Sequence, residues 1–205
     1  MRITKFPQSC VVIEGSGGGR ALVDPGNVAM DAVDFDAFGA IDTVLFTHRH
    51  ADHFDPRALA AIQERGLEIH ANADVCGLIG DGATAVTDGQ TFTTAGFEIT
   101  AHDLPHVTLV DGSPGPPNTG FVFDGHLLHP GDSLQVAGLR VDAFALPVAG
   151  PDVSFRDAYV ALETTGATTA VPIHYDVFIV DPAVFTRYCD IAEVIILDHG
   201  DSTDL

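Results

Sequence analysis

Thr47-His48-Arg49-His50-Ala51-Asp52-His53 is the stretch that decides how this chain is interpreted. It places three histidines and an aspartate within six residues, directly after the apolar run 43–46. Imidazole nitrogens and carboxylate oxygens are the usual protein ligands of zinc and similar divalent ions. A strand fixes where such a loop begins, and the irregular backbone of the loop lets its side chains converge. The stretch therefore predicts a metal site.

The spacing within this loop favours two metal ions over one. His48 and His50 lie two residues apart, so an extended backbone points both side chains to the same side. Asp52 and His53 are adjacent and diverge unless the backbone turns. A pair of ions can use all four groups, with His48 and His50 on the first and Asp52 and His53 on the second. A solvated, histidine-rich turn is the disfavoured alternative, because four ligand groups follow a buried strand.

The pattern His-x-His-x-Asp-His, complete at 48–53, resembles the signature of the metallo-β-lactamase superfamily. The resemblance implies an α/β fold, a four-layer αβ/βα sandwich of two mixed β-sheets flanked by helices. It implies a hydrolytic site with one or two metal ions at one edge of that sandwich. It also implies three more ligands downstream, which are a histidine, a bridging aspartate after a strand, and a last histidine.

Later motifs supply these ligands in family order. His106 fits the placement of the third ligand after the strand expected at 97–101, and His102 is the alternative. Asp132 follows His129-Pro130-Gly131, a form that resembles small hydrolase-like proteins near the ascorbate-6-phosphate lactonase-like branch, and it is the implied bridging ligand. Pro172-Ile173-His174-Tyr175 resembles the final ligand motif. The implied set is therefore His48, His50 and His106 for one ion, Asp52, His53 and His174 for the other, and Asp132 between them.

Two residues are expected to support the ligands. Asp24, in Asp24-Pro25-Gly26, orients the metal loop by the resemblance, and a plain Asp-Pro turn is the alternative. His129 is expected to donate a hydrogen bond and to bind no metal. Members of the branch often carry a Gly-His pair near the first turn, but Gln8-Ser9 stands there, so a role for that histidine is absent. His70 and His199 are expected to lie outside the site.

The expected elements alternate in an order that indicates α/β layers. Helices are expected at 31–39 (in part), from Pro56 onward, at 73–79, from Ser154 to about 163, and at 181–190. Strands are expected at 2–6, 10–14, 20–24, 43–46, 67–70, 84–87, 91–94, 97–101, 121–123, 126–128, 141–146, 168–171 and 193–197.

Length and composition suit one globular domain over residues 1–205, since 46% of the 205 residues are hydrophobic. No apolar run is long enough for a membrane span and no signal-peptide pattern opens the chain, so we expect a cytoplasmic protein without a membrane partner. Cys10, Cys76 and Cys189 lie far apart and are expected to be reduced.

The formal net charge is −20, from nine basic and 29 acidic residues. Such a surface repels phosphate backbones, so nucleic acid is not an expected partner. We hypothesise that the acidity is an adaptation to a high-salt cytoplasm, and compositional bias is the alternative explanation.

Together these features predict a metal-dependent hydrolase with a dinuclear site. Two divalent ions would activate a water, with zinc the first expectation and manganese or iron the alternatives. Asp52 is the expected catalytic residue, which orients the water or relays its proton. The expected substrate is a small-molecule ester or lactone, by analogy to the branch. The alternatives are a phosphoesterase of small molecules and a metal-binding protein without turnover.

Overall fold

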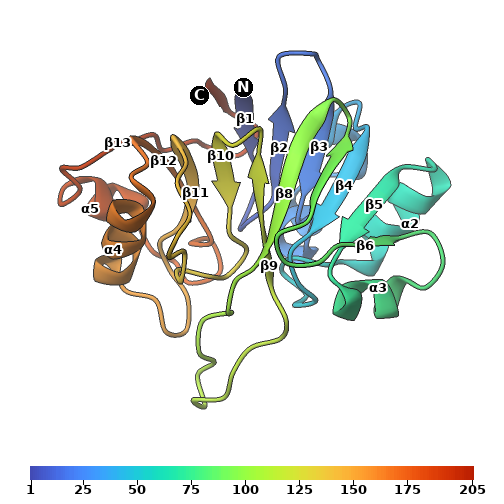
Figure 1. Cartoon of the computed structure of the whole chain (residues 1–205). Helices are drawn as coiled ribbons and strands as arrows, with labels where there is room; N and C mark the ends of the chain where they lie inside the picture. Colours follow the sequence, from blue (N-terminus) through green and yellow to red (C-terminus); the bar gives the residue numbers. More distant parts are fainter.

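Two seven-stranded β-sheets form the centre of the computed structural model, which describes residues 1–205 (Figure 1). Both sheets are mixed, because antiparallel hairpins lie at one side of each sheet and parallel strands at the other. The first sheet has the strand order β14-β1-β2-β3-β4-β5-β6. Its strands are β1 (Arg2–Lys5), β2 (Val11–Glu14), β3 (Arg20–Val23), β4 (Thr43–Phe46), β5 (Glu68–Ala71), β6 (Thr84–Ala85) and β14 (Ser202–Asp204).

The second sheet has the order β13-β12-β11-β10-β9-β8-β7. Its hairpin between β9 and β10 turns at Asp124-Gly125, where both residues have positive φ as this dipeptide favours. Its strands are β7 (Thr91–Thr94), β8 (Phe97–Asp103), β9 (Thr119–Phe123), β10 (Leu127–His129), β11 (Ala143–Pro147), β12 (Thr169–Ile173) and β13 (Glu193–Val194).

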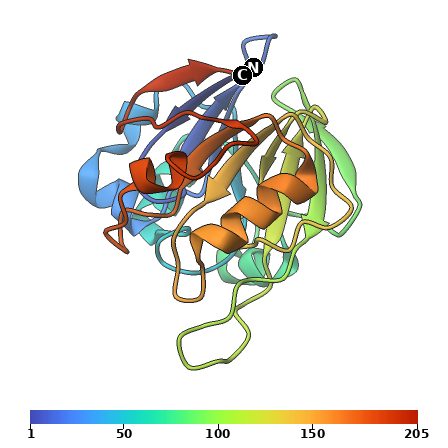
Figure 2. The same cartoon turned by 90° about the vertical axis from the view of Figure 1, so that its left-hand side faces the viewer.

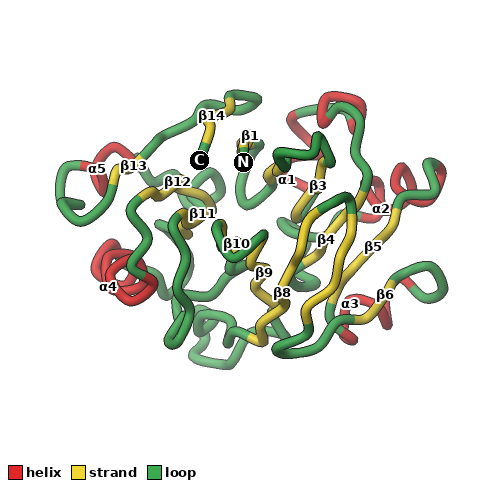
Figure 3. The backbone as a smooth tube through the Cα atoms, turned by 45° about the horizontal axis from the view of Figure 1, so that its top comes forward, coloured by secondary structure: helices red, strands yellow, loops and turns green.

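Helices cover the outer face of each sheet, so the expected four-layer sandwich is confirmed (Figure 3). The first sheet is covered by α1 (Asn27–Ala32), the 3-10 helix Phe35–Phe38, α2 (Pro56–Glu64) and α3 (Ala73–Ile79). The second is covered by α4 (Phe155–Thr165) and α5 (Pro182–Thr186). None of these helices combines the length and the apolar character that a membrane span requires.

Strands that are apolar on both faces explain the layers. In β2, Val11 and Ile13 pack between the sheets, whereas Val12 packs under the helices of the first sheet. This alternation follows from the period of two in a strand. Sheets covered on both faces need such continuous apolar runs. The core therefore has three layers, one between the sheets and one between each sheet and its helices.

Three expected boundaries differ from the structure by three residues or more, and one strand was not expected. Residues 31–39 are helical in part, as expected, but the first helix already begins at Asn27, because Gly26 starts it and the extended Val33 ends it. The last helix stops at Thr186 and not at 190, and β13 is shorter than 193–197. The strand β14 was not expected, because it is polar and forms only by pairing with the edge of β1. That pairing brings the two termini together (Figure 2).

Candidate metal centre

Loops at the carboxyl ends of four strands bring seven candidate side chains together. Residues 48–53 follow β4, and the other loops follow β8, β10 and β12. Potential ligand atoms within each of two groups lie within 4.8 Å of one another. The first group holds His48, His50, His106 and Asp132, and the second holds Asp52, His53 and His174.

Asp24 fixes the start of the metal loop from the end of β3. Its carboxylate accepts hydrogen bonds from Thr47 N (2.8 Å), Thr47 Oγ1 (2.7 Å) and His53 Nδ1 (2.7 Å). Asp24 itself has a φ of 51°. A side chain at Gly26 would collide with the backbone of Asp52, so the Asp-Pro-Gly turn has a physical reason. These three hydrogen bonds tie the start and the end of the loop to the end of β3.

The same bonds determine the tautomers of two histidines. Thr47 donates its only hydroxyl hydrogen to Asp24, so it must accept from His48 Nδ1, which is 3.0 Å away. His53 donates from Nδ1 to Asp24. Both rings therefore carry hydrogen on Nδ1 and direct Nε2, the possible ligand atom, toward the centre.

Backbone carbonyls anchor two more rings in the same way. His106 Nδ1 lies 2.6 Å from Val107 O, and His174 Nδ1 lies 2.8 Å from Ala149 O. A histidine that ligates metal normally donates its other ring N–H to such an acceptor. All four anchored rings thus turn Nε2 toward the centre.

Asp132 lies between the two groups. Its Oδ1 is 3.0 Å from His53 Nε2. Its Oδ2 is 3.1 Å from His174 Nε2, 3.4 Å from His106 Nε2 and 3.8 Å from His48 Nε2. A carboxylate with two oxygens in this position can serve both groups and offset the repulsion of two cations.

The centre satisfies a chemical test for a cation. His50 Nδ1 lies 3.2 Å from both His48 Nε2 and His106 Nε2, and one proton can bridge only one such pair. The buried atoms His53 Nε2, His174 Nε2 and Asp132 Oδ1 make no hydrogen bond of good geometry, although an Asp132 oxygen lies within 3.1 Å of each ring nitrogen. A buried polar atom without a partner costs about 1–3 kcal/mol. Divalent ions would satisfy these atoms, so the residues fit a metal centre.

Charges within the centre shift its pKa values in opposite directions. Burial, aided by neighbouring His53, lowers the pKa of His48 far below its usual range. Burial opposes protonation of His174, but the Asp132 carboxylate outweighs it and raises the pKa of His174 to about 9. The same competition raises the pKa of His53. Without metal, protons on the latter two rings neutralise the carboxylates, and metal ions would displace them.

The remaining histidines lie outside both groups. His102 pairs with Gly120 inside the sheet, so His106 and not His102 reaches the first group. His70 stacks on Phe92 with ring centroids 4.6 Å apart, and His199 Nε2 lies 2.8 Å from Asp176.

His129 makes its hydrogen bonds to backbone atoms around the centre. It is fully buried, and its Nε2 lies 2.9 Å from the carbonyl oxygen of Ser9. Its Nδ1 accepts from Gly131 N at 3.3 Å. These hydrogen bonds hold the turn before Asp132, and the supporting role of His129 stays a prediction.

Sequence reasoning missed two supporting amides. Asn118 Oδ1 accepts from Asp132 N (3.1 Å), while its Nδ2 donates to the carbonyls of Leu104 and Pro130. Gln8 is buried and donates from Nε2 to Asp52 Oδ2 (2.9 Å). Neither carries a motif. The only signal was position, at the start of β9 for Asn118 and in the first turn for Gln8.

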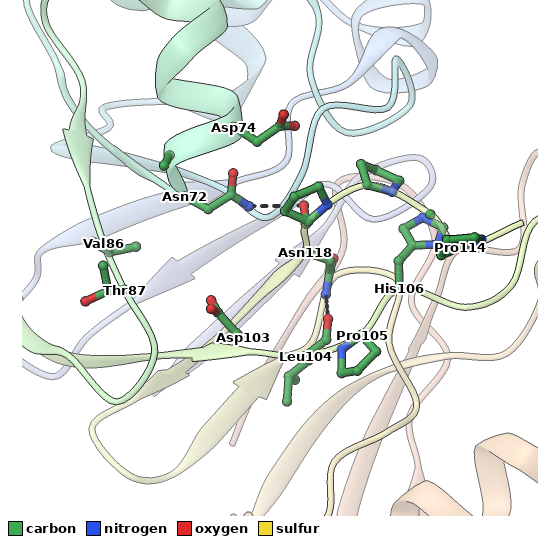
Figure 4. A pocket seen from close by; sticks show the side chains of 14 residues that line it. Asn72, Asp74, Val86, Thr87, Asp103, Leu104, Pro105, His106, Pro114 and Asn118 are labelled. Atoms are coloured by element: carbon green, nitrogen blue, oxygen red, sulfur yellow. Dashed lines mark hydrogen bonds between the residues drawn. The ribbon is translucent and has the colours of Figure 1, made fainter.

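Two cavities with different chemistry adjoin the centre. A cavity of about 550 Å³ is lined by His106, Asp74 and Asp103, together with loop 114–118, and no lysine or arginine lines it (Figure 4). A second cavity of about 380 Å³ is lined by Ala149 and Phe178, which contact His174, and six of its seven lining residues are hydrophobic. The centre therefore has an acidic side and an apolar side.

Comparisons with known proteins agree with this geometry. The model of a family described as "Beta-lactamase superfamily domain" matches residues 2–174. Protein Rv0786c of Mycobacterium tuberculosis is 30% identical over 181 residues, which cover 85% of this chain and 84% of that protein. A UPF0173 metal-dependent hydrolase of Shouchella clausii is 28% identical, with both chains covered completely. The structure of Igni18, a metallo hydrolase of Ignicoccus hospitalis, has a TM-score of 0.79 at 20% identity, covering 100% of this chain and 98% of that one.

Proposed function

Since this chain belongs to the β-lactamase superfamily of metal-dependent proteins, we propose that it is a hydrolase with a dinuclear metal site. His48, His50 and His106 would hold one ion, Asp52, His53 and His174 the other, and Asp132 would bridge them. One observation carries the proposal: four histidines are anchored at Nδ1 and direct Nε2 at one carboxylate. A relative of similar length is named a metal-dependent hydrolase, which supports the reaction class.

The nature of the donors limits the metal. All seven donors are nitrogen or oxygen and none is sulfur, a set that suits zinc and also manganese or iron. We propose zinc as the first candidate for the bound metal. When bound, the ions would supply Lewis acidity, which lowers the pKa of a water and polarises the bond to be cleaved.

Asp52 has a second role in the proposal. Its side chain is 25% exposed, more than the other carboxylate of the centre, so it can reach a water. Burial opposes ionisation, but the hydrogen bond with His174 and the charge of His53 lower the pKa of Asp52. The carboxylate is therefore ionised at neutral pH. It can orient the attacking water, accept its proton and pass that proton to the leaving group.

The two cavities favour a small ester or lactone as substrate. Beside His174, the side chains of Phe178 and Val153 offer an apolar surface that suits the hydrocarbon part of such a molecule. Beside His106, Asp74 and Asp103 line a cavity without a cationic side chain in its lining, although Arg49 Nε lies 3.4 Å from the Asp74 carboxylate. A phosphoester carries negative charge and would be repelled by the Asp103 carboxylate, whereas Arg49 offsets the charge of Asp74. The ester is therefore the first proposal.

The test combines metal analysis with a substrate screen. Protein purified without added metal is assayed for metal content, then for hydrolysis of matched nitrophenyl esters, lactones and phosphodiesters. We expect about two ions per chain and ester turnover. His50→Ala and Asp132→Ala should abolish turnover, whereas His126→Ala, outside the centre, should not. Bound metal without turnover on any substrate would refute the hydrolase and leave a metal-binding protein.

A further inference from the structure

Gln8 occupies a strained and buried position in the turn between β1 and β2. Its side chain is fully buried and its φ is 64°, in the left-handed region that residues other than glycine seldom adopt. Such conformations persist only when surrounding contacts enforce them, and they concentrate at functional sites. Asp24 and His174, both at the centre, have positive φ as well.

Four hydrogen bonds enforce the conformation of Gln8. Its Nε2 donates to Asp52 Oδ2 at 2.9 Å, and its Oε1 accepts from Val177 N at 3.2 Å. Its carbonyl oxygen accepts from His174 N at 3.0 Å, and its N–H donates to Asp176 Oδ2 at 2.6 Å. One residue thus holds the side chain of Asp52 and the backbone of His174. These two belong to the same candidate metal group but come from opposite halves of the chain.

The Asp176 carboxylate, which accepts from Gln8 N, is itself held in place by other residues. Asp176 Oδ2 also lies 3.2 Å from Nζ of Lys5, the only lysine of the chain, which is fully buried. Tyr175 covers that ammonium, with the ring centroid 4.4 Å from Nζ. His199 holds the other oxygen of Asp176 at 2.8 Å. The carboxylate that accepts from Gln8 N is therefore locked from three sides.

We propose that Gln8 is the positioning residue that assembles the second metal group, an inference that rests on the dinuclear site proposed above. Val177 fixes which end of the amide faces Asp52, so the amide presents N–H to Oδ2, the oxygen that lies 3.4 Å from His174 Nε2 and 3.8 Å from His53 Nε2. A neutral donor suits this place. A lysine or arginine would make the same bond but add a positive charge beside a cation.

The experiment compares variants of the full chain in a cobalt titration. Gln8→Met keeps the length of the side chain but removes both amide bonds. Gln8→Asn tolerates the left-handed backbone, which keeps the variant folded, but is one methylene too short to reach Asp52. Gln63→Met, on the exposed face of α2, is the matched control. The readouts are visible absorption, elemental analysis and chelator competition for each of the two ions.

We expect the first ion to bind equally in all proteins and the second to bind about 10–100-fold more weakly in both Gln8 variants, as for other residues that orient a ligand. Equal weakening of both ions would indicate general structural damage, and unchanged binding would show that Gln8 is dispensable. Either result overturns the proposal. A wild-type protein that binds one ion overturns both proposals. Selective loss of the second ion in a protein without turnover would support Gln8 and refute only the hydrolase.

Discussion

Asp24→Asn tests the tautomer that the structure assigns to His53. Asparagine has nearly the same shape as aspartate and tolerates the φ of 51° at this position. Its Oδ1 can still accept from Thr47 N, but its NH2 group replaces the oxygen that accepts from Thr47 Oγ1 and His53 Nδ1. The hydroxyl of Thr47 and Nδ1–H of His53 would then both face the N–H groups of the asparagine, so donors would meet donors. His53 resolves the conflict by moving its hydrogen to Nε2, the atom 3.0 Å from Asp132 Oδ1.

The expected loss of metal affinity follows from this change of tautomer. A hydrogen on Nε2 removes the lone pair of one of the three ligands of the second group. Mutation of such supporting residues weakens metal binding about 10–100-fold, which corresponds to about 1.4–2.8 kcal/mol. The metal-free protein should also lose about 1–3 kcal/mol of stability, because buried donors lose their acceptors.

Chelator competition measures the affinity of each ion, and thermal melting shows that the variant folds. Asp42→Asn is the matched control, because this exposed carboxylate also accepts a backbone hydrogen bond, from Arg20 N, but lies away from the centre. The reasoning is refuted if Asp24→Asn folds and binds both ions as tightly as the control does.

Three further predictions follow from the described geometry. The folded pKa of His174, about 9 against an ordinary 6.5, stabilises the metal-free protein below pH 6.5 by about 3 kcal/mol, and this stability is lost as pH rises from 6.5 to 9. Thermal melting of metal-free protein should show the loss, and a flat profile would contradict it. Gly131→Ala should cost about 2–4 kcal/mol in chemical denaturation, because a Cβ there meets Asn118 Oδ1 at a φ of 60°. Gly138→Ala, with positive φ but open space, should cost only the backbone part. Added KCl should raise the melting temperature by screening the net charge of −20, and a constant or falling value would rule out the high-salt hypothesis.

The fold was predictable where strands are apolar on both faces and where the metal loop follows one of them. The run 43–46 is fully buried as β4, and the loop after it contributes His48 and His50 to one group of side chains and Asp52 and His53 to the other. A strand that forms only by pairing with the edge of a neighbouring strand was not predictable from its own sequence. The polar β14 exists because β1 has an open edge, and its own residues carry no alternating pattern.

The candidate ligands were predictable because their chemistry is local to short motifs, but the residues that orient them were not. Gln8 and Asp52 meet across long stretches of chain, and an isolated glutamine in a turn carries no periodic signal. The tautomers of His48 and His53 likewise depend on a single hydroxyl hydrogen of Thr47. That assignment requires a completed hydrogen-bond network, which spacing alone does not give.

Each group of candidate ligands draws on both halves of the sandwich. The first joins His48 and His50 to residues that follow strands of the second sheet, and the second group joins Asp52 to His174 in the same manner. Ions held there would cross-link the two sheets at long sequence separation, where closing a loop restricts the unfolded chain most. The cysteines are all free. In this chain without disulfides, the bound metal ions would then act as cross-links between the two sheets. The two halves of the sandwich could separate only after the ions are released.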